Sequence, residues 1–242
     1  MEEKALIIES IKLIVFDVDG TLAETDDYFV EKGSILIGKI LPFIKKEHIQ
    51  KIVRPIVMSG ETVLHSFYRL LDLVGLDSLL SKAHSKFSVK NEYKYAEIKG
   101  MTETLKLLSK KFRIGIISSG GRSSTLEFVK KFELQSKIEY IISAEDCKFI
   151  KPHPMPLLKI SELSGIPIKN CLMVGDTIFD ILCAKRAGAY SAAVLSGFDS
   201  KFLIKRFHAD WILESVNELP ALLNVSDVGA EGNSSNNKKD LV

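Results

Sequence analysis

The sequence predicts an α/β protein, with a doubly wound parallel sheet core that carries an inserted all-α helical domain. Three observations indicate this fold. Short apolar runs each end in a polar or glycine-containing turn, helix-period segments lie between these runs, and one long early segment has helical patterns only. Such runs are typical of buried parallel strands, and their alternation with helices is typical of a doubly wound core.

The first predicted strand, residues 12–16, is short, apolar and rich in β-branched side chains, and it ends in the polar turn 17–21. The same design predicts further strands at residues 113–117, 138–142, 171–174, 190–195 and 211–213. Apolar side chains at helical spacing predict helices at residues 102–110, 123–132, 155–164 and 178–187. We expect the ligand site beyond the carboxyl ends of these strands.

The segment 22–96 contains no convincing strand, but it has amphipathic stretches such as residues 27–38, 46–57 and 62–74. We expect it to form a helical cap domain that stands over the site as a lid. The α/β core then comprises residues 1–21 and 97–227. The tail, residues 228–242, is rich in glycine, serine, asparagine and lysine, which predicts disorder.

The bulk composition excludes several classes of function. A formal net charge of +2 provides no global field for nucleic acid or an anionic membrane. The longest apolar runs are far shorter than the roughly 20 residues of a membrane span, and residues 1–11 do not resemble a secretory signal. Cys147, Cys171 and Cys183 lack metal-ligand spacing and are expected to be reduced thiols. We expect a cytoplasmic protein, as a monomer or homodimer.

Asp17 and Asp19 leave the first predicted strand at its exposed end, in the sequence Asp-Val-Asp-Gly-Thr. Two neighbouring carboxylates repel each other. They are stable together if a divalent cation or a shared proton offsets the charge, or if burial raises one pKa so that the group serves as an acid. Alone, this pair is more typical of an ordinary turn rich in aspartate and asparagine.

Asp176 and Asp180 follow the strand at residues 171–174, separated by four positions. On the first turn of a helix these positions share a face, so both side chains could point at one cation. The alternative is an acidic helix start, which is favourable in itself.

Two further groups supply donors and positive charge. Ser118, Ser119 and Gly120 lie between a predicted strand and a helix whose cap is expected near Ser123, so they could offer hydroxyl and N–H groups to a phosphate. Lys151 is flanked by Pro152 and Pro154, although a lone lysine is usually solvated. Metal-binding acids, phosphate donors and a cation would converge on one crevice.

These four groups, in this order, resemble the motifs of the haloacid-dehalogenase superfamily of phosphatases, over roughly residues 11 to 225. The helical insert resembles the type-1 cap of that family, found in phosphoglycolate phosphatases and β-phosphoglucomutases. The resemblance implies a Rossmann-like core and a Mg²⁺-dependent hydrolase of small phosphomonoesters. Members that act on carbon–halogen bonds lack an acid at the position of Asp19, so that activity is disfavoured.

The resemblance also implies a role for each motif residue. Asp17 would attack phosphorus and ligate Mg²⁺ through its other oxygen. Asp19 would act as acid and base, with its backbone carbonyl on the metal. Asp176 would be the second carboxylate ligand and Asp180 an outer group that orients metal waters or Lys151. The implied phosphate-binding group is Thr21, which would also hold the first loop, with Ser118, Ser119, Gly120 and Lys151.

The substrate and the reaction type stay open among several alternatives. A sugar-phosphate mutase has the same four motifs, and a non-catalytic binding protein could use the same fold. A phosphonate hydrolase would need a Schiff-base lysine in the cap, where no lysine is marked by a pattern. Arg54 of the cap could meet a carboxylate, which would fit phosphoglycolate, or it could be a solvated arginine.

Overall fold

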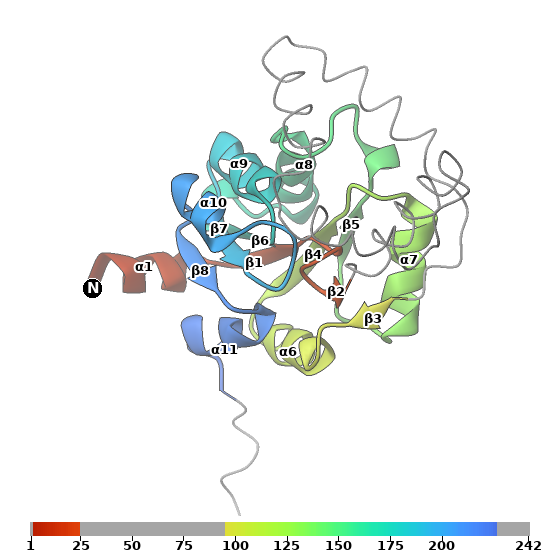
Figure 1. Ribbon diagram of the computed structural model, residues 1–242, viewed down its shortest axis with the longest axis horizontal. Helices are drawn as coiled ribbons and strands as arrows, with labels where there is room; N and C mark the ends of the chain where they lie inside the picture. The colour runs from red at the N-terminus through yellow and green to blue at the C-terminus, as the bar shows by residue number, and fades with distance from the viewer. Residues whose placement is uncertain (1, 25–94, 227–242) are drawn as a thin grey trace, which may run out of the picture.

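The computed structural model describes residues 2–24 and 95–226 and confirms the predicted fold class. Its core is a six-stranded parallel sheet with the order β5-β4-β1-β6-β7-β8 (Figure 1). The strands are β1 Leu13–Phe16, β4 Arg113–Ile117, β5 Tyr140–Ile142, β6 Cys171–Gly175, β7 Tyr190–Val194 and β8 Trp211–Leu213. The strand order reverses its direction of progression beside β1, and in a sheet of this kind a ligand crevice forms at that point.

The central strand β1 is buried along its whole length because helices cover both faces of the sheet. Ile14 and Phe16 pack in one apolar cluster with Leu105 and Phe128, whereas Leu13 and Val15 pack in a second cluster on the other face. Alternate residues of a strand point to opposite faces, so a short run without polar residues fits a strand covered on both sides.

Seven helices and three short 3₁₀ turns are described around this sheet. The helices are α1 Glu2–Ser10, α6 Met101–Leu108, α7 Arg122–Lys131, α8 Met155–Ser164, α9 Ile178–Ala187, α10 Lys201–Arg206 and α11 Leu219–Leu222. The 3₁₀ turns are η1 Ala144–Asp146, η2 Ile168–Asn170 and η3 Val216–Glu218. Apolar residues of α6, α7 and α11 belong to the first cluster, and those of α8 and α9 belong to the second. None of the described helices has the length and apolar character needed to cross a membrane.

The local structure differs from the expected one in three places. Two-residue strands, β2 Ala23–Glu24 and β3 Ala96–Glu97, pair antiparallel at the two edges of the segment for which we expected no strand. Helix α1 lies where no helix was assigned. The cap of α7 is Gly121, not a residue near Ser123, and the hydroxyls of Ser124 and Thr125 donate back to the Gly121 carbonyl.

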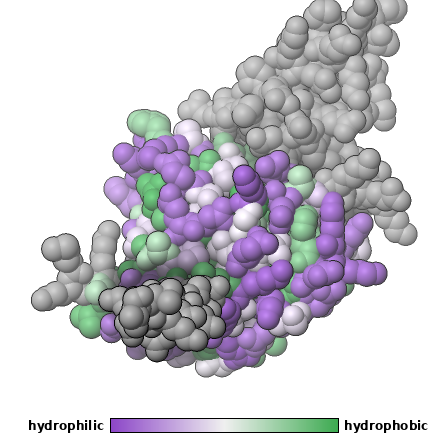
Figure 2. All heavy atoms as spheres, turned by 90° about the horizontal axis from the view of Figure 1, so that it is seen from below, coloured by the Kyte–Doolittle hydropathy of each residue, from purple (hydrophilic) through white to green (hydrophobic). Residues whose placement is uncertain are grey.

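The expected amphipathic stretches of the cap, the whole tail, and Arg54 lie outside the described residues. On the described surface, hydrophilic side chains dominate the face shown in Figure 2. The large apolar side chains that are exposed on the described residues are spread over α1, α7, α8 and α10: Leu6, Leu126, Leu158, Leu163 and Phe202.

Candidate active site

The predicted chemical groups meet at the carboxyl edge of the sheet. β1 pairs in parallel with β4 on one side and with β6 on the other, so Phe16 stands opposite Ile116 and Val174. The loops that begin at Asp17, Ser118 and Asp176 therefore leave the sheet side by side. The Asp17 N–H donates to the Val174 carbonyl at 2.9 Å, which ties the first of these loops to β6.

Lys151 is the centre of the charged network. Its Nζ lies 2.6 Å from Asp17 Oδ1 and 2.7 Å from Asp180 Oδ1, and its side chain is only 4% exposed. An ammonium group buried to this degree needs paired charges, because it has lost its hydration. Burial alone would lower the pKa of Lys151, but the carboxylates of Asp17 and Asp180 raise it above the ordinary value, so the group stays charged.

The first-loop acids have unusual affinities for protons. Burial, with the negative charges of Asp180 and Asp19, raises the pKa of Asp17 to about 7 although Lys151 opposes this change. Burial also raises the pKa of Asp19 to about 6. Asp19 nevertheless retains some accessible surface, whereas Asp17 is buried. The carboxyl group of Asp19 can therefore hold a proton near neutral pH and still reach a substrate.

Asp17, Asp176 and Asp180 form a buried cluster in which one carboxylate oxygen of each residue lies within 4.8 Å of the other two. Burial raises the pKa of Asp176, and the charges of Asp17 and Asp180 add to that effect. Three carboxylates face one buried ammonium group, so the cluster has an excess of negative charge when it is ionised. Hard oxygen donors with uncompensated charge suit Mg²⁺, and this donor set therefore fits the metal that the sequence predicts.

Each acid of the fourth motif is oriented by hydrogen bonds. Asp176 Oδ1 accepts from the Thr21 hydroxyl at 2.9 Å, and its Oδ2 accepts from the Phe198 N–H at 2.8 Å. Asp180 Oδ2 accepts from the Thr177 hydroxyl and N–H at 2.6 and 3.1 Å, which makes a capping box at the start of α9. Its Oδ1 is left to face Lys151.

Thr21 is fully buried, and its hydroxyl hydrogen points to Asp176. This contact fits the predicted role in holding the first loop, while the predicted contact with phosphate stays a prediction. The neighbouring Gly20 has φ +79°, and a Cβ there would lie 2.4 Å from Asp176 Oδ2. Only glycine lets the first loop pass this close to the carboxylate.

The predicted phosphate loop follows β4. Ser118 is buried, and its Oγ accepts from the Gly120 N–H at 3.0 Å. The Ser119 N–H has no hydrogen-bond partner within residues 2–24 and 95–226. A phosphoryl group would therefore find one N–H group at Ser119 and would compete with Ser118 for the other, at Gly120.

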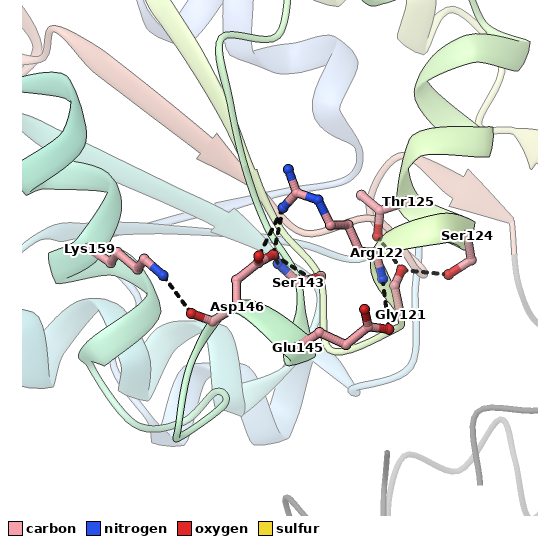
Figure 3. Close-up of polar contacts among 8 residues, drawn as sticks. All are labelled: Gly121, Arg122, Ser124, Thr125, Ser143, Glu145, Asp146 and Lys159. Carbon is pink, nitrogen blue, oxygen red and sulfur yellow. Dashed lines mark hydrogen bonds and ion pairs between the residues drawn. The ribbon is translucent and has the colours of Figure 1, made fainter. Parts of the chain in front are cut away.

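A polar network braces this loop from the next strand connection (Figure 3). The Arg122 guanidinium donates to both oxygens of Asp146 at 2.8 and 2.9 Å, and the Ala144 N–H donates to the Gly120 carbonyl. Burial alone would raise the pKa of Asp146, but hydrogen bonds from Ser143 and Arg122 lower it below the ordinary value. The carboxylate therefore stays charged and holds the start of α7 against η1.

The model of the family "Haloacid dehalogenase-like hydrolase" matches residues 14–194, which include all four motifs. The chain belongs to this family. It is accordingly an enzyme, and the resemblance inferred from the motifs is confirmed.

Relatives in the family include the pyrophosphatase PpaX of Halalkalibacterium halodurans, which is 26% identical over 91% of this chain and 99% of that protein. PpaX of Bacillus cereus (strain AH820) is 24% identical over 88% of this chain and 96% of its own length. These relatives support hydrolysis of phosphoric esters.

Solved structures of the family have the same fold. A hydrolase from Pseudomonas syringae superposes with a TM-score of 0.61 at 26% identity, covering 89% of this chain and 100% of that one. A structure described as a predicted phosphoglycolate phosphatase from Haemophilus somnus superposes with a TM-score of 0.63 at 18% identity, over 88% and 98% of the two chains. The second comparison shows the fold alone.

One part of the site of this hydrolase, the loop that follows β7, was not predicted from the sequence. The Ser196 hydroxyl donates to the Gly20 carbonyl at 2.9 Å, and Asp199 Oδ2 accepts from the Ile178 N–H at 2.6 Å. A polar run after a predicted strand was the available signal, because it places these residues at the same sheet edge as the motifs.

Proposed function

We propose that this haloacid dehalogenase-like hydrolase is a Mg²⁺-dependent phosphatase of small phosphorylated metabolites that forms an aspartyl phosphate at Asp17. The observation that carries the proposal is the buried bridge of Lys151 between Asp17 and Asp180. It places a permanent positive charge against the carboxylate of Asp17, at the carboxyl edge of the sheet. A nucleophile of this kind must be ionised and held in place, and the ammonium group contributes to both.

The first half-reaction uses Asp17 and Asp19. A carboxylate oxygen of Asp17 attacks phosphorus, and the bond from phosphorus to the leaving oxygen breaks. Asp19, whose pKa of about 6 keeps part of the population protonated near neutral pH, gives its proton to the leaving oxygen. Ser118 and the N–H groups of Ser119 and Gly120 bind the phosphoryl oxygens, and Lys151 offsets their charge.

The second half-reaction regenerates the enzyme. Asp19, now ionised, takes a proton from water, and the resulting hydroxide attacks the phosphorus of the aspartyl phosphate. The bond between phosphorus and the Asp17 oxygen breaks, which releases inorganic phosphate and returns the carboxylate. Asp17 and Asp176 would hold Mg²⁺, with Asp180 beside them, and the bound cation supplies positive charge that offsets the carboxylates and the phosphoryl group.

Inorganic pyrophosphate is a second candidate substrate beside phosphomonoesters. The relatives named pyrophosphatase match almost their whole length to this chain, so the likeness extends beyond the motifs. Phosphoglycolate stays a candidate through Arg54, which lies outside the described residues. A sugar-phosphate mutase shares the same phosphoenzyme and differs only in the acceptor.

The test is phosphate release from a panel that contains pyrophosphate, phosphoglycolate, nucleotides and hexose phosphates, with Mg²⁺ and with EDTA. Asp17→Asn is the control, because it keeps the size of the side chain and removes the nucleophile. We expect release with Mg²⁺, loss of release with EDTA and no turnover by the variant. Steady turnover by Asp17→Asn would contradict the proposal, and conversion of β-hexose 1-phosphate to its 6-phosphate without release would indicate the mutase.

A further inference from the structure

The segment 196–199, here called the β7 loop, joins β7 to α10 and contacts both acidic loops of the site. The Ser196 hydroxyl reaches the Gly20 carbonyl of the first loop, and the Phe198 N–H reaches Asp176 Oδ2. Asp199 reaches the Ile178 N–H, at the start of α9. Three of the four residues of this short loop thus make a hydrogen bond to the site.

Gly197 lies against the carboxylate of Asp176. A Cβ at this position would lie 2.0 Å from Asp176 Oδ2 and 2.3 Å from its Cγ. Because heavy atoms cannot approach so closely, any larger residue would displace the carboxylate or the loop. The backbone of the β7 loop at Gly197 thus packs directly against the Asp176 carboxylate, and the Phe198 N–H donates to that carboxylate at 2.8 Å.

Asp199 joins the β7 loop to the start of α9. Its side chain is 4% exposed, and its Oδ2 accepts from the first N–H of α9 at 2.6 Å. That helix carries Asp180, whose Oδ1 contacts Lys151. A carboxylate at a helix N-terminus is favourable, and it also fixes the distance between the β7 loop and the helix.

We propose that the β7 loop is the positioning element for the metal carboxylate: Gly197 and the Phe198 N–H orient Asp176, and Asp199 sets the loop against α9. This inference rests on the proposed function, because it concerns the affinity of the same site for Mg²⁺. Ser196, Gly197 and Asp199 are positioning residues that act through Gly20, Asp176 and Ile178. Groups that orient a metal ligand typically change metal affinity by about 10- to 100-fold when they are lost.

The test measures Mg²⁺ binding alone, by isothermal titration calorimetry without substrate. We expect Gly197→Ala and Asp199→Ala to raise the Kd for Mg²⁺ at least about 10-fold. Asp199→Asn should recover most of the affinity, because its amide oxygen still accepts from the Ile178 N–H. If Gly197→Ala does not fold, the two Asp199 variants decide.

The matched control is Asp210→Ala at the opposite end of β7. Asp210 Oδ2 accepts from the Ser191 N–H and hydroxyl, both at 2.8 Å, so this variant loses comparable hydrogen bonds away from the site. It should lower the melting temperature in EDTA and leave the Kd unchanged. If wild type binds Mg²⁺ and the Kd values of Asp199→Ala and Gly197→Ala lie within about twofold of the wild-type Kd, the inference about the β7 loop is overturned and the proposed function is not. Wild-type protein without Mg²⁺ binding would overturn the metal dependence of the proposed function, and this inference with it.

Discussion

Asp17 and Asp19 are two positions apart in the chain, but their surroundings differ. Asp17 is buried against Lys151, whereas Asp19 keeps accessible surface and is not part of the side-chain cluster of Asp17, Asp176 and Asp180. The pKa values, about 7 and about 6, are both far above that of an aspartate in water. The contacts suit Asp17 to be held and to attack, and they suit Asp19 to exchange a proton with substrate or water.

The role of Asp19 predicts a dependence on the leaving group. Asp19→Asn should lower kcat for an alkyl phosphate by about 10²- to 10⁴-fold, because the leaving alkoxide then receives no proton. The loss for the first half-reaction should be much smaller with p-nitrophenyl phosphate, whose leaving group is stable as an anion. Pre-steady-state release of nitrophenolate, compared with alcohol release from the alkyl ester, measures this difference. Equal losses for the two substrates would contradict a role as acid.

The raised pKa of Asp17 predicts how stability depends on pH without metal. Because the folded-state pKa of about 7 exceeds the ordinary value of 3.8, protonated Asp17 is favoured in the fold, and its stabilising contribution is lost as pH rises through about 7. Asp17→Asn stays neutral throughout. In EDTA, the melting temperature of this variant relative to wild type should therefore increase from about pH 5 to about pH 8. Parallel melting curves across that range would contradict the assigned pKa.

At the scale of elements, α9 combines a helix start with the active site. The capping box joins Thr177 to Asp180, and the other oxygen of Asp180 contacts Lys151. The first turn of the helix therefore carries Asp180, the residue that also contacts Lys151. A substitution in the capping box of α9 should therefore change both the stability of the protein and its catalytic rate.

Thr177→Ala tests this coupling, with Thr177→Ser as its matched control. The alanine variant loses the 2.6 Å bond to Asp180 and should be less stable by about 1 kcal/mol, as is usual for the loss of a helix cap. It should also lower kcat, since Asp180 is then held by the backbone N–H alone. Urea unfolding and phosphate release measure the two effects, and serine should restore both. If the alanine variant is destabilised but fully active, the helix cap does not contribute to catalysis and the prediction is contradicted.

The sequence predicted some elements to the residue and missed others, for physical reasons. The bounds of α8 and α9 agree with the prediction because Pro156 lies in the first turn of α8 and a glycine ends each helix. The strands β2 and β3 have two residues each, too few to show a period. At α7, a run of serines suggested a cap near Ser123, but the cap is Gly121 and the helix begins at Arg122.

The four motifs could be placed at one edge of the sheet because parallel strands bring their carboxyl ends together. Their contacts could not be predicted in the same way. The Phe198 N–H bonds Asp176 across 22 positions, and a backbone group carries no mark in the sequence. The role of Gly197 likewise depends on the approach of a side chain from another strand.

At the scale of the whole molecule, we expect the cluster of acids to make the stability of the fold depend on metal. Asp17, Asp176 and Asp180 meet only when β1, β6 and α9 are assembled, so a cation bound there stabilises the folded state alone. At a Mg²⁺ concentration about 100-fold above Kd, this stabilisation is about 2.7 kcal/mol. The melting temperature should therefore rise with Mg²⁺ and fall with EDTA.

Asp176→Asn provides the control for this response. The variant keeps the size of the side chain and an oxygen for hydrogen bonds, but it loses one negative charge of the cluster. Its melting temperature should change little between Mg²⁺ and EDTA, whereas that of wild type should differ by several degrees. A wild-type melting temperature that is the same in both conditions would contradict a metal site in this cluster.

The central claim is that Asp17 carries the phosphoryl group during turnover. The most direct measurement mixes enzyme, Mg²⁺ and the best substrate of the panel, quenches the reaction in acid within its first turnover, and maps the modified peptide by mass spectrometry. We expect a phosphoryl group on Asp17 that forms and disappears at rates compatible with kcat, and none in Asp17→Asn. Turnover with Asp17 unmodified, or a phosphoryl group on another residue, would contradict it.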